Sequence, residues 1–304
     1  MRVLVTGANG FIGSHLIRYL VGLNKYDIFA LVRKKANINL LSLINDKINI
    51  LRIEQNFKSI DKAFSRAKPD VVIHLAAKTF VGHKPEDIKP LISSNILFSS
   101  LLVEAMIKNG VKCLVNTGTF WEYTSGKSDY SPFNLYAATK IAFENFLKYY
   151  AVAKDMRCVT LKLYGVYGPN DPRTKIFSYF KKSLSPEKPV LFSPGKQRLD
   201  LVYIDDVVDA YEKAARYVYK KKDSIYEYFF IGSGKGVALR RIASIYEKCV
   251  GRPLNIEWGG LPYRNREIIY SHADIRLAKK KINWSPKFDL RKGISKMLEV
   301  EERG

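Results

Sequence analysis

The first twenty residues constrain the fold more than any other stretch of the chain. An apolar run from Arg2 to Thr6 is followed by the turn Gly7-Ala8-Asn9-Gly10-Phe11-Ile12-Gly13 and then by apolar residues at helical spacing. Glycines at such a turn let the backbone bend tightly and approach a pyrophosphate, which then contacts the N–H groups of the next helix. The strand, turn and helix together predict a dinucleotide-binding unit.

A second pattern, Tyr136-Ala137-Ala138-Thr139-Lys140, places a tyrosine and a lysine four residues apart. Residues at this spacing lie on one face of a helix, so both side chains address the same point. A lysine ammonium favours the phenolate, which brings a tyrosine pKa of about 10 closer to neutrality. Thr117, at the end of an apolar run, is expected to hold the substrate oxygen that exchanges a proton with Tyr136. Alone, this spacing is also typical of an ordinary exposed helix face; the glycine turn favours the catalytic interpretation.

Together the two motifs make the chain resemble the extended short-chain dehydrogenase/reductase family, in particular its nucleotide-sugar-modifying members. The resemblance covers nearly the whole chain. It includes the motifs Ile73-His74-Leu75-Ala76-Ala77, Tyr167-Gly168-Pro169-Asn170-Asp171 and Val202-Tyr203-Ile204-Asp205-Asp206-Val207. Pro262-Tyr263-Arg264, followed by Glu267, is similar to the nucleotide-sugar 4-ketoreductases that complete deoxyhexoses.

The resemblance implies an α/β fold, with a Rossmann-type doubly wound parallel sheet and a smaller, interleaved C-terminal substrate domain. The dinucleotide-binding domain is expected at 1–164 plus about 200–222, and the substrate-binding domain at about 165–199 and 223–304. Five further strands are predicted at Asp27–Val32, Ile48–Ile53, Val71–Leu75, Cys113–Asn116 and Arg157–Leu163. Helices are predicted at 60–67, 92–109, 135–154, 176–183, 239–250 and 290–299, with a strand at 229–231. A further helix is expected to run to about Tyr219 from a cap at Asp205 or Asp206.

The end of the second predicted strand bears on the cofactor. Arg33-Lys34-Lys35 stands where enzymes that prefer NAD place an acid for the ribose 2′-hydroxyl, whereas a cation accommodates a 2′-phosphate. The sequence therefore favours NADP(H), with NAD(H) as the alternative. The family commonly has Gly-Asp where this chain has Gln55-Asn56, and the Asn56 amide is expected to contact adenine in its place. The expected cofactor contacts are Gly7, Asn9, Gly10, Phe11, Ile12, Gly13, Arg33, Lys34, Asn56, Leu75, Ala76, Ala77, Lys78, Asn95, Tyr136, Lys140 and Tyr164.

The residues beside Thr117 bear on the type of reaction. The 4,6-dehydratases of this family carry Asp-Glu directly after the threonine, whereas this chain has Gly118-Thr119, so elimination is not expected. Epimerase-reductases use a cysteine and a histidine near the substrate, but Cys113 lies inside a predicted strand and no such cysteine follows Thr117. Gly165 stands where many epimerases have an asparagine. What remains is hydride transfer at a carbonyl.

In that reaction Tyr136 donates the proton, Thr117 positions the carbonyl, and Lys140 lowers the tyrosine pKa and holds the nicotinamide ribose. The substrate is expected to be an anion, because the planar fork of arginine suits bidentate contact with a diphosphate. The candidate substrate contacts are Thr79, Thr119, Arg173, Lys175, Arg198 and Arg264. Of these, Arg198 and Arg264 match family motif positions.

The sequence therefore predicts NADPH-dependent reduction of the 4-keto group of a CDP-, dTDP- or GDP-linked 4-keto-6-deoxyhexose, in deoxysugar biosynthesis for lipopolysaccharide or another surface polysaccharide. A nucleotide-sugar 4-epimerase with retained NAD is the alternative. A non-catalytic NADP-binding regulator and an RNA-binding relative are hypotheses from another class. The intact set of Thr117, Tyr136 and Lys140 argues against both.

Composition places the protein in a cell compartment and excludes some partners. No apolar run approaches the roughly 20 residues of a membrane span, and the chain begins directly with a strand, which leaves no room for a signal peptide. Cys113, Cys158 and Cys249 are scattered singly and the four histidines show no ligand spacing, so we expect reduced thiols, no metal site and a cytoplasmic location. The net charge of +22 is spread along the 304 residues, which predicts a lysine-rich surface rather than binding to nucleic acid or a membrane. We expect a homodimer.

Overall fold

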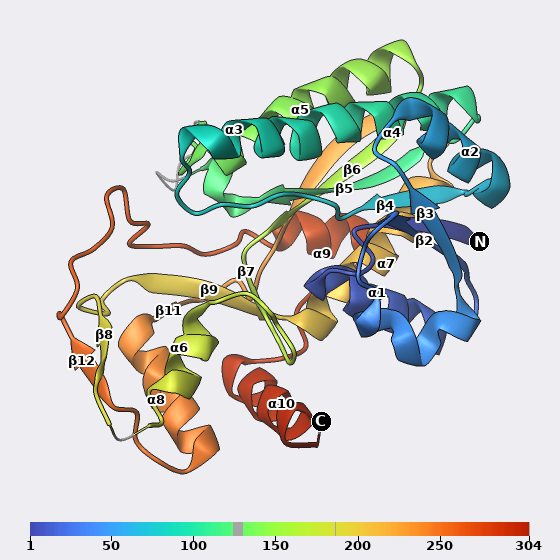
Figure 1. The fold of residues 1–304 in the computed structure, drawn as a ribbon. Coiled ribbons are helices and arrows are strands. Elements are labelled where there is room, and N and C mark those ends of the chain that lie inside the picture. The colour runs from blue at the N-terminus through green and yellow to red at the C-terminus, as the bar shows by residue number, and fades with distance from the viewer. Residues whose placement is uncertain (124–129, 186, 304) are drawn as a thin grey trace. The chain divides into compact units, whose positions relative to one another are not determined.

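A computed structural model describes residues 1–123, 130–185 and 187–303 (Figure 1). The chain forms two compact units. The first contains Met1–Leu163, Val207–Phe230 and Arg276–Trp284, and the second contains Tyr164–Asp206, Ile231–Ile275 and Ser285–Gly304. The predicted α/β class with a Rossmann-type central sheet is confirmed. The boundaries of these units differ from those of the expected domains, because 223–230 and 276–284 group with the first unit and 200–206 group with the second. The functional division into domains stays a prediction.

The first unit is built on a seven-stranded sheet in the order β10-β6-β5-β4-β1-β2-β3. The strands are β1 (Arg2–Thr6), β2 (Asp27–Arg33), β3 (Asn49–Ile53), β4 (Val71–His74), β5 (Cys113–Thr119), β6 (Arg157–Leu163) and β10 (Ile225–Ile231). Neighbouring strands from β3 to β6 are parallel. The order reverses between β1 and β4, and ligands of such sheets bind beyond the carboxyl ends of the strands at this point.

Helices cover both faces of this sheet. Figure 1 shows α2 (Phe57–Ala67), α4 (Phe98–Lys108) and α5 (Leu135–Ala153) on one face, and α1 (Phe11–Gly22) and α7 (Ile204–Lys220) on the other. The first unit also contains α9 (Arg276–Ile282) and the short helices η1 (Asn39–Lys47) and η3 (Phe120–Glu122). Because helices cover both faces, strand residues such as Val3, Leu4 and Val5 are fully buried and read as continuous apolar runs.

The helix predicted at 92–109 begins earlier. It starts at Pro85 as α3 (Pro85–Ile92), where Asp87 accepts a hydrogen bond from the Lys84 N–H (3.0 Å), and continues through η2 (Ser93–Leu97) into α4. By length and composition this continuous helix is apolar enough to cross a membrane, contrary to the sequence-based expectation. Its residues Phe98, Leu102 and Val103 are buried in the main hydrophobic core, which is the packing of a core helix.

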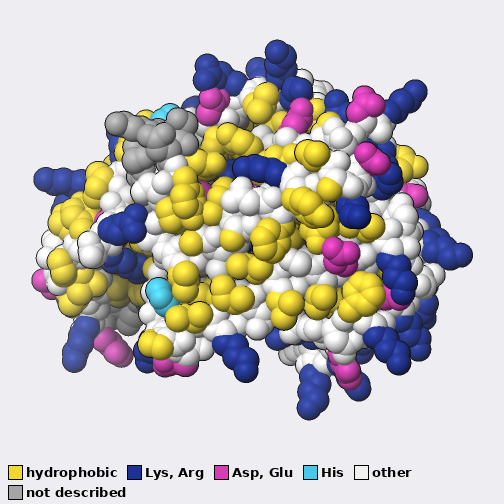
Figure 2. Space-filling model, turned by 90° about the horizontal axis from the view of Figure 1, so that it is seen from above, with side chains coloured by type: hydrophobic (Ala, Val, Ile, Leu, Met, Phe, Trp, Pro, Cys, Tyr) yellow, Lys and Arg dark blue, Asp and Glu magenta, His cyan; other side chains and the backbone are white. Residues whose placement is uncertain are grey.

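The outer face of these helices is partly apolar. Exposed apolar side chains lie on α3 (Ile88 and Ile92, 44% and 41% exposed) and on α5 (Tyr149 and Val152, 60% and 85%). Figure 2 shows that apolar side chains gather in the middle of this face, whereas lysine and arginine side chains stand mostly around its edge. An exposed apolar band with a charged rim is typical of a surface that meets another protein.

The second unit combines short strands and helices. A three-stranded sheet has the order β11-β9-β7, and β12 pairs with β8. The elements are β7 (Gly165–Tyr167), α6 (Ile176–Lys182), β8 (Val190–Phe192), β9 (Arg198–Tyr203), β11 (Gly236–Ala238), α8 (Leu239–Val250), β12 (Ile256–Trp258) and α10 (Leu290–Arg303). The three helices were predicted, but the strands were not, because most have three residues and show too little alternation.

The expected cap at the start of α7 is wrong. The helix begins at Ile204, so Asp205 and Asp206 lie inside its first turn. The Asp206 carboxylate accepts hydrogen bonds from the N–H groups of Lys287 (2.8 Å) and Phe288 (3.1 Å), and therefore fixes the segment that leads into α10. A sequence pattern cannot distinguish a helix cap from a carboxylate that binds a distant loop.

Candidate active site

The glycine turn after β1 has the geometry that close approach to a phosphate requires. Gly7 has a φ of +65°, and a Cβ there would lie 2.7 Å from the Ala76 nitrogen. A Cβ on Gly13 would overlap the Gly7 carbonyl and lie 2.7 Å from the Ala8 Cα. In this fully described segment, Gly10 supplies no capping side chain to α1 and the first turn holds no acid. The N–H groups at the start of α1 therefore suit the pyrophosphate of a dinucleotide.

The segment after β4 lies beside this turn. The Thr6 hydroxyl accepts a hydrogen bond from the Ala76 N–H (3.1 Å) and shares another with His74 Nδ1 (2.7 Å). His74 Nε2 pairs with the Ser99 hydroxyl (2.9 Å). Burial, and then the nearby Lys140, lower the pKa of His74 to about 3. A neutral imidazole therefore holds the Leu75-Ala76-Ala77 segment in place.

Asn95 connects three elements at this edge. Its side-chain oxygen accepts from the Lys78 N–H (2.8 Å), and its nitrogen donates to the Lys78 carbonyl (2.9 Å) and to the Thr139 hydroxyl of α5 (2.9 Å). The side chain is buried in η2, a π-helical turn that lies inside the longer helix. Asn95 thus positions the loop after β4 and the turn of α5 that carries Lys140.

The residues expected around the adenosine have mixed environments. Arg33 is exposed at the end of β2, while Lys34 forms an ion pair with Glu54 (3.1 Å). Asn56 caps α2, because its side-chain oxygen accepts from the Ser59 N–H (2.9 Å). Asn9 donates to the Asn37 carbonyl (2.9 Å). Lys34, Asn56 and Asn9 therefore already have partners within the chain, whereas the Arg33 side chain is exposed at the end of β2.

Thr117 lies inside β5, which continues beyond its predicted end at Asn116 because Thr117, Gly118 and Thr119 pair with β6. Its hydroxyl donates to the His74 carbonyl (2.8 Å) and shares a hydrogen bond with the Tyr211 hydroxyl (2.7 Å). Tyr211 is a fully buried residue of α7. No sequence pattern indicates Tyr211, since 94 residues separate it from Thr117.

Tyr136 and Lys140 lie one turn apart on α5. Asn134 caps this helix by accepting from the Ala137 N–H (2.9 Å). Tyr136 is half-buried, and its ring meets the Trp121 ring edge-on with centroids 6.2 Å apart. Lys140 is buried, and the loss of solvent lowers its pKa to about 8, although Glu144 and Glu122 act in the opposite direction. A lysine with this pKa is ready to change its charge near neutrality.

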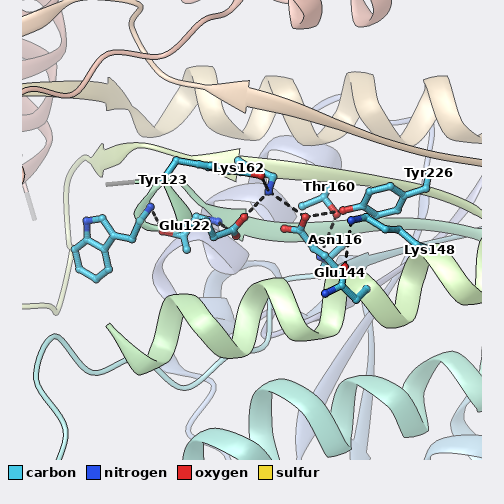
Figure 3. A network of polar contacts seen from close by, with 11 residues as sticks. Asn116, Glu122, Tyr123, Glu144, Lys148, Thr160, Lys162 and Tyr226 are labelled. Carbon is cyan, nitrogen blue, oxygen red and sulfur yellow. Dashed lines mark hydrogen bonds and ion pairs between the residues drawn. The ribbon is translucent and has the colours of Figure 1, made fainter. Parts of the chain in front are cut away.

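A buried ionic network lies next to this set, and the sequence did not reveal it (Figure 3). Lys162 of β6 contacts the Glu122 carboxylate of η3, the Glu144 carboxylate of α5 (3.0 Å) and the Tyr123 hydroxyl (3.2 Å). Tyr226 of β10 donates to Glu144 (2.6 Å). The side chains of Glu122, Glu144 and Lys162 are at most 1% exposed. In the sequence these two acids and this lysine resemble surface charges, but in the fold their side chains are buried.

The remaining candidates divide between the units. Thr79 is exposed in the first unit, and Thr119 caps η3 by accepting from the Trp121 N–H (3.3 Å). Tyr164, Arg173, Lys175, Arg198 and Arg264 belong to the second unit.

Among the arginines of the second unit, Arg173 forms a two-point contact with Asp171 (2.6 Å each). Arg198 donates to the Gly236 carbonyl (2.8 and 3.1 Å). Arg264 is exposed near Tyr263, whose hydroxyl accepts from the Lys196 N–H (3.1 Å). All three arginines are exposed, and Arg173 and Arg198 also use their guanidinium groups for contacts within the chain.

Comparison with known proteins identifies the family. The model of the NAD dependent epimerase/dehydratase family matches residues 3–227. The chain belongs to this family. The family match confirms the predicted resemblance and the predicted class of enzyme, an NAD(P)-dependent oxidoreductase of the extended short-chain type.

Relatives of different activity lie at similar distances within the epimerase/dehydratase family. The chain is 30% identical to CDP-abequose synthase of Salmonella typhimurium, with 98% of this chain and 97% of the relative covered. It is also 30% identical to UDP-glucose 4-epimerase of Mycolicibacterium smegmatis, with 98% of each covered. Among solved structures, Thermotoga maritima UDP-glucose 4-epimerase with UDP-glucose is 25% identical, with a TM-score of 0.86 over 100% of this chain and 99% of the other. Bacillus cereus UDP-glucuronic acid 4-epimerase with UDP-glucuronic acid and NAD is 26% identical, with the same TM-score and coverage.

Proposed function

We propose that the chain catalyses NADPH-dependent reduction of the 4-keto group of a nucleotide-diphospho-4-keto-6-deoxyhexose. The observation that carries this proposal is that the carboxylates near Thr117 are buried and paired. Gly118 and Thr119 follow it directly, and the nearby carboxylates, Glu122 and Glu144, are buried and paired with Lys162. Neither is accessible to a substrate, so the site offers a proton donor and a charge but no acid–base pair for elimination.

The residues of the first unit perform the protein's part of the reaction. Tyr136 donates a proton to the carbonyl oxygen, and Lys140 stabilises the phenolate that results. Thr117 donates a hydrogen bond to the same oxygen when its hydroxyl turns away from the His74 carbonyl (2.8 Å), and the Tyr211 hydroxyl (2.7 Å) donates to the Thr117 oxygen. When bound, NADPH supplies the hydride. The start of α1 holds the pyrophosphate and the Leu75-Ala76-Ala77 segment lines the site beside the glycine turn.

The preference for NADPH rests on the end of β2. Arg33 is exposed there, and Lys34 is held by Glu54 (3.1 Å), so the 2′-phosphate contact falls to Arg33 and Lys35. Arg33→Asp is expected to weaken NADPH much more than NADH, because charge-assisted hydrogen bonds contribute about 1.5–3 kcal/mol. Lys62→Asp, an exposed residue of α2, changes the net charge equally and serves as the control. Tighter binding of NADH than NADPH to the unchanged protein would contradict this assignment.

The substrate side is proposed to be a CDP-, dTDP- or GDP-linked sugar held by the second unit. The similarity to CDP-abequose synthase at 30% identity supports a CDP-linked sugar. A place in surface-polysaccharide biosynthesis in the cytoplasm belongs to the same proposal. Arg264 is accessible for the diphosphate, whereas Arg173 must first exchange its contact with Asp171. The expected homodimer is proposed to form through the apolar band on α3 and α5.

The second candidate is a nucleotide-sugar 4-epimerase that retains NAD. The similarity to solved 4-epimerases with NAD, such as that of Bacillus cereus at 26% identity, favours it. An epimerase regenerates its own cofactor within each cycle, whereas a reductase must exchange cofactor at every turnover. The two functions therefore differ in the fate of added cofactor.

The test offers the protein a panel of CDP-, dTDP- and GDP-4-keto-6-deoxyhexoses with NADPH or NADH. We expect loss of the ultraviolet absorbance of NADPH, with about one cofactor oxidised per sugar reduced. Conversion of UDP-glucose or another fully hydroxylated sugar nucleotide to its 4-epimer, with no net change in added cofactor, would establish the second candidate instead.

A further inference from the structure

The face of α5 that carries Tyr136 and Lys140 continues into the buried ionic network. Tyr136, Lys140 and Glu144 are spaced four residues apart and so lie one above the other along the helix. Glu144 is packed against β5 at Gly118, where a Cβ would lie 2.8 Å from its Oε1 atom. The residue next to Thr117 is therefore small enough to admit a carboxylate from the helix.

Lys162 connects two elements of this region through its ion pairs. It contacts Glu122, which belongs to the segment directly after β5, and Glu144, which belongs to α5. Its ammonium also lies over the rings of Tyr123 (4.8 Å) and Tyr228 (4.7 Å). Lys162 thus ties together the two elements that carry Thr117 and Tyr136, in a fully buried environment.

Two carboxylates in this region share the single ammonium of Lys162. Burial, and then the neighbouring Glu144, raise the pKa of Glu122 to about 7, so above pH 7 both carboxylates are charged and one negative charge is left in a region with little solvent to screen it. Glu144 Oε1 has no hydrogen-bond partner among the described residues. An ammonium one helical turn away is the group that compensates this charge.

We propose that the Glu122–Lys162–Glu144 network is a positioning device for the active site. Lys162 holds two carboxylates in the interior, and one of them, Glu144, keeps Lys140 in its ammonium form. This inference rests on the proposed function only in that it assigns Lys140 to the reaction. Glu122, Glu144 and Lys162 act through Lys140 and do not touch the substrate.

The titratable groups around Lys140 agree with this role. They are Tyr136 and Glu144 on α5, Glu122 on η3, Lys162 on β6 and His74 on β4. His74 is neutral and Lys162 is already paired, so the two carboxylates are the groups that favour the charged form of Lys140. Burial acts against that form, and without the network Lys140 would lose its proton at a lower pH.

The test measures the charge of Lys140 directly. Full-length protein with a carbon-13 label in its lysines is titrated by NMR, and the Lys140 signal is identified by its absence in Lys140→Met. In Glu144→Gln we expect the Lys140 titration to move to lower pH by about one unit, a tenfold change in the ratio of charged to neutral form. Turnover at about pH 8 should fall about fivefold with KM little changed, because the charged fraction falls from about a half to about a tenth.

Two controls separate charge from packing. Glu104 of α4 accepts a hydrogen bond from Tyr150 of α5 (2.6 Å), as Glu144 does from Tyr226 (2.6 Å), and Glu104→Gln should leave the Lys140 titration unchanged. Tyr226→Phe removes the hydroxyl but keeps the Glu144 charge, so the titration should move much less than in Glu144→Gln.

An unchanged Lys140 titration in Glu144→Gln would overturn the proposal. If that variant does not fold, Glu122→Gln decides, with a smaller shift in the same direction expected and no shift overturning the proposal. The NMR titration needs no turnover. The expected shift in a protein that reduces no keto sugar would therefore contradict the proposed function alone.

Discussion

Two lysines of the first unit are equally buried and have opposite pKa shifts. Lys140 is 1% exposed, and burial lowers its pKa to about 8. Lys162 is fully buried, and burial again disfavours its ammonium, but Glu144 and Glu122 together raise its pKa above the usual value. The difference lies in the direct ion pairs, because both carboxylates contact Lys162.

This comparison shows that burial by itself does not decide what a lysine does. An ammonium held between two carboxylates is a permanent charge that fixes the surrounding elements. An ammonium that only lies near those carboxylates changes its charge within the physiological range and can assist a proton transfer. We therefore expect the network region to be structural and the neighbouring face of α5, which carries Tyr136 and Lys140, to be reactive.

The largest effect is expected at the reactive face. Tyr136→Phe should lower turnover by ~10²–10⁴-fold, as expected for a lost general acid, and should leave cofactor binding intact. Steady-state kinetics and cofactor titration measure both quantities. Tyr149→Phe changes an exposed tyrosine of the same helix (60% exposed) and should have no effect. Near-normal turnover in Tyr136→Phe would remove the distinction between the two regions.

The next effect tests the structural lysine. Lys162→Met leaves two carboxylates buried without their common partner and should lower the free energy of unfolding by about 3–5 kcal/mol. Denaturant unfolding measures this change. Lys148→Met, at an exposed position of α5, should stay within about 0.5 kcal/mol of the unchanged protein. The triple variant Lys162→Met/Glu122→Gln/Glu144→Gln should recover part of the loss, because no buried charge is left unpaired.

Replacement of the reactive lysine, Lys140, should change the free energy of unfolding in the opposite direction to replacement of Lys162. The folded-state pKa of Lys140 is about 8, below its usual 10.5, so the unfolded chain holds this proton more tightly. The resulting cost to stability is fully present below pH 8 and disappears as the pH rises toward 10.5. Lys140→Met should therefore raise the free energy of unfolding at neutral pH, by up to about 3 kcal/mol, while abolishing turnover.

The pH dependence of the free energy of unfolding tests whether Lys140→Met stabilises the protein for this reason. The gain from Lys140→Met should shrink as the pH rises above about 8. If Lys140→Met destabilised the protein at neutral pH as much as Lys162→Met does, the two lysines would not differ in the way described.

The smallest effect is expected at the contact between the two regions. In Gly118→Ala the new Cβ would lie 2.8 Å from Glu144 Oε1 and 2.9 Å from Thr160 Cγ2, so the carboxylate or the strand must move. Overpacking of this kind costs about 1–3 kcal/mol. Gly22→Ala, where a Cβ meets no atom within 4 Å, is the control and should be neutral or slightly stabilising. Unfolding experiments on both variants compare the two sites, and equal stabilities would mean that Glu144 is not held against Gly118.

The sequence predicted the elements that are long and periodic. The strands β1 to β6 and the helices α1, α2 and α5 lie close to their predicted positions, because alternation and helical spacing are local signals. The errors occurred where local signals are weak. Three-residue strands such as β7 and β11 were missed, and the long helix begins at Pro85 rather than Ile92 because its first turn is mostly exposed and polar.

The candidate site shows the same division. The sequence by itself determined the glycine turn, Thr117, Tyr136 and Lys140, because each motif is short and its geometry follows from one strand or one helix. Only the tertiary structure decided that Tyr211 meets Thr117 across 94 residues, and that Glu122 meets Lys162 across 40. A charged residue is exposed in most sequences, so its burial depends on the partners that the fold brings to it, and those partners lie too far along the chain for any pattern to reveal.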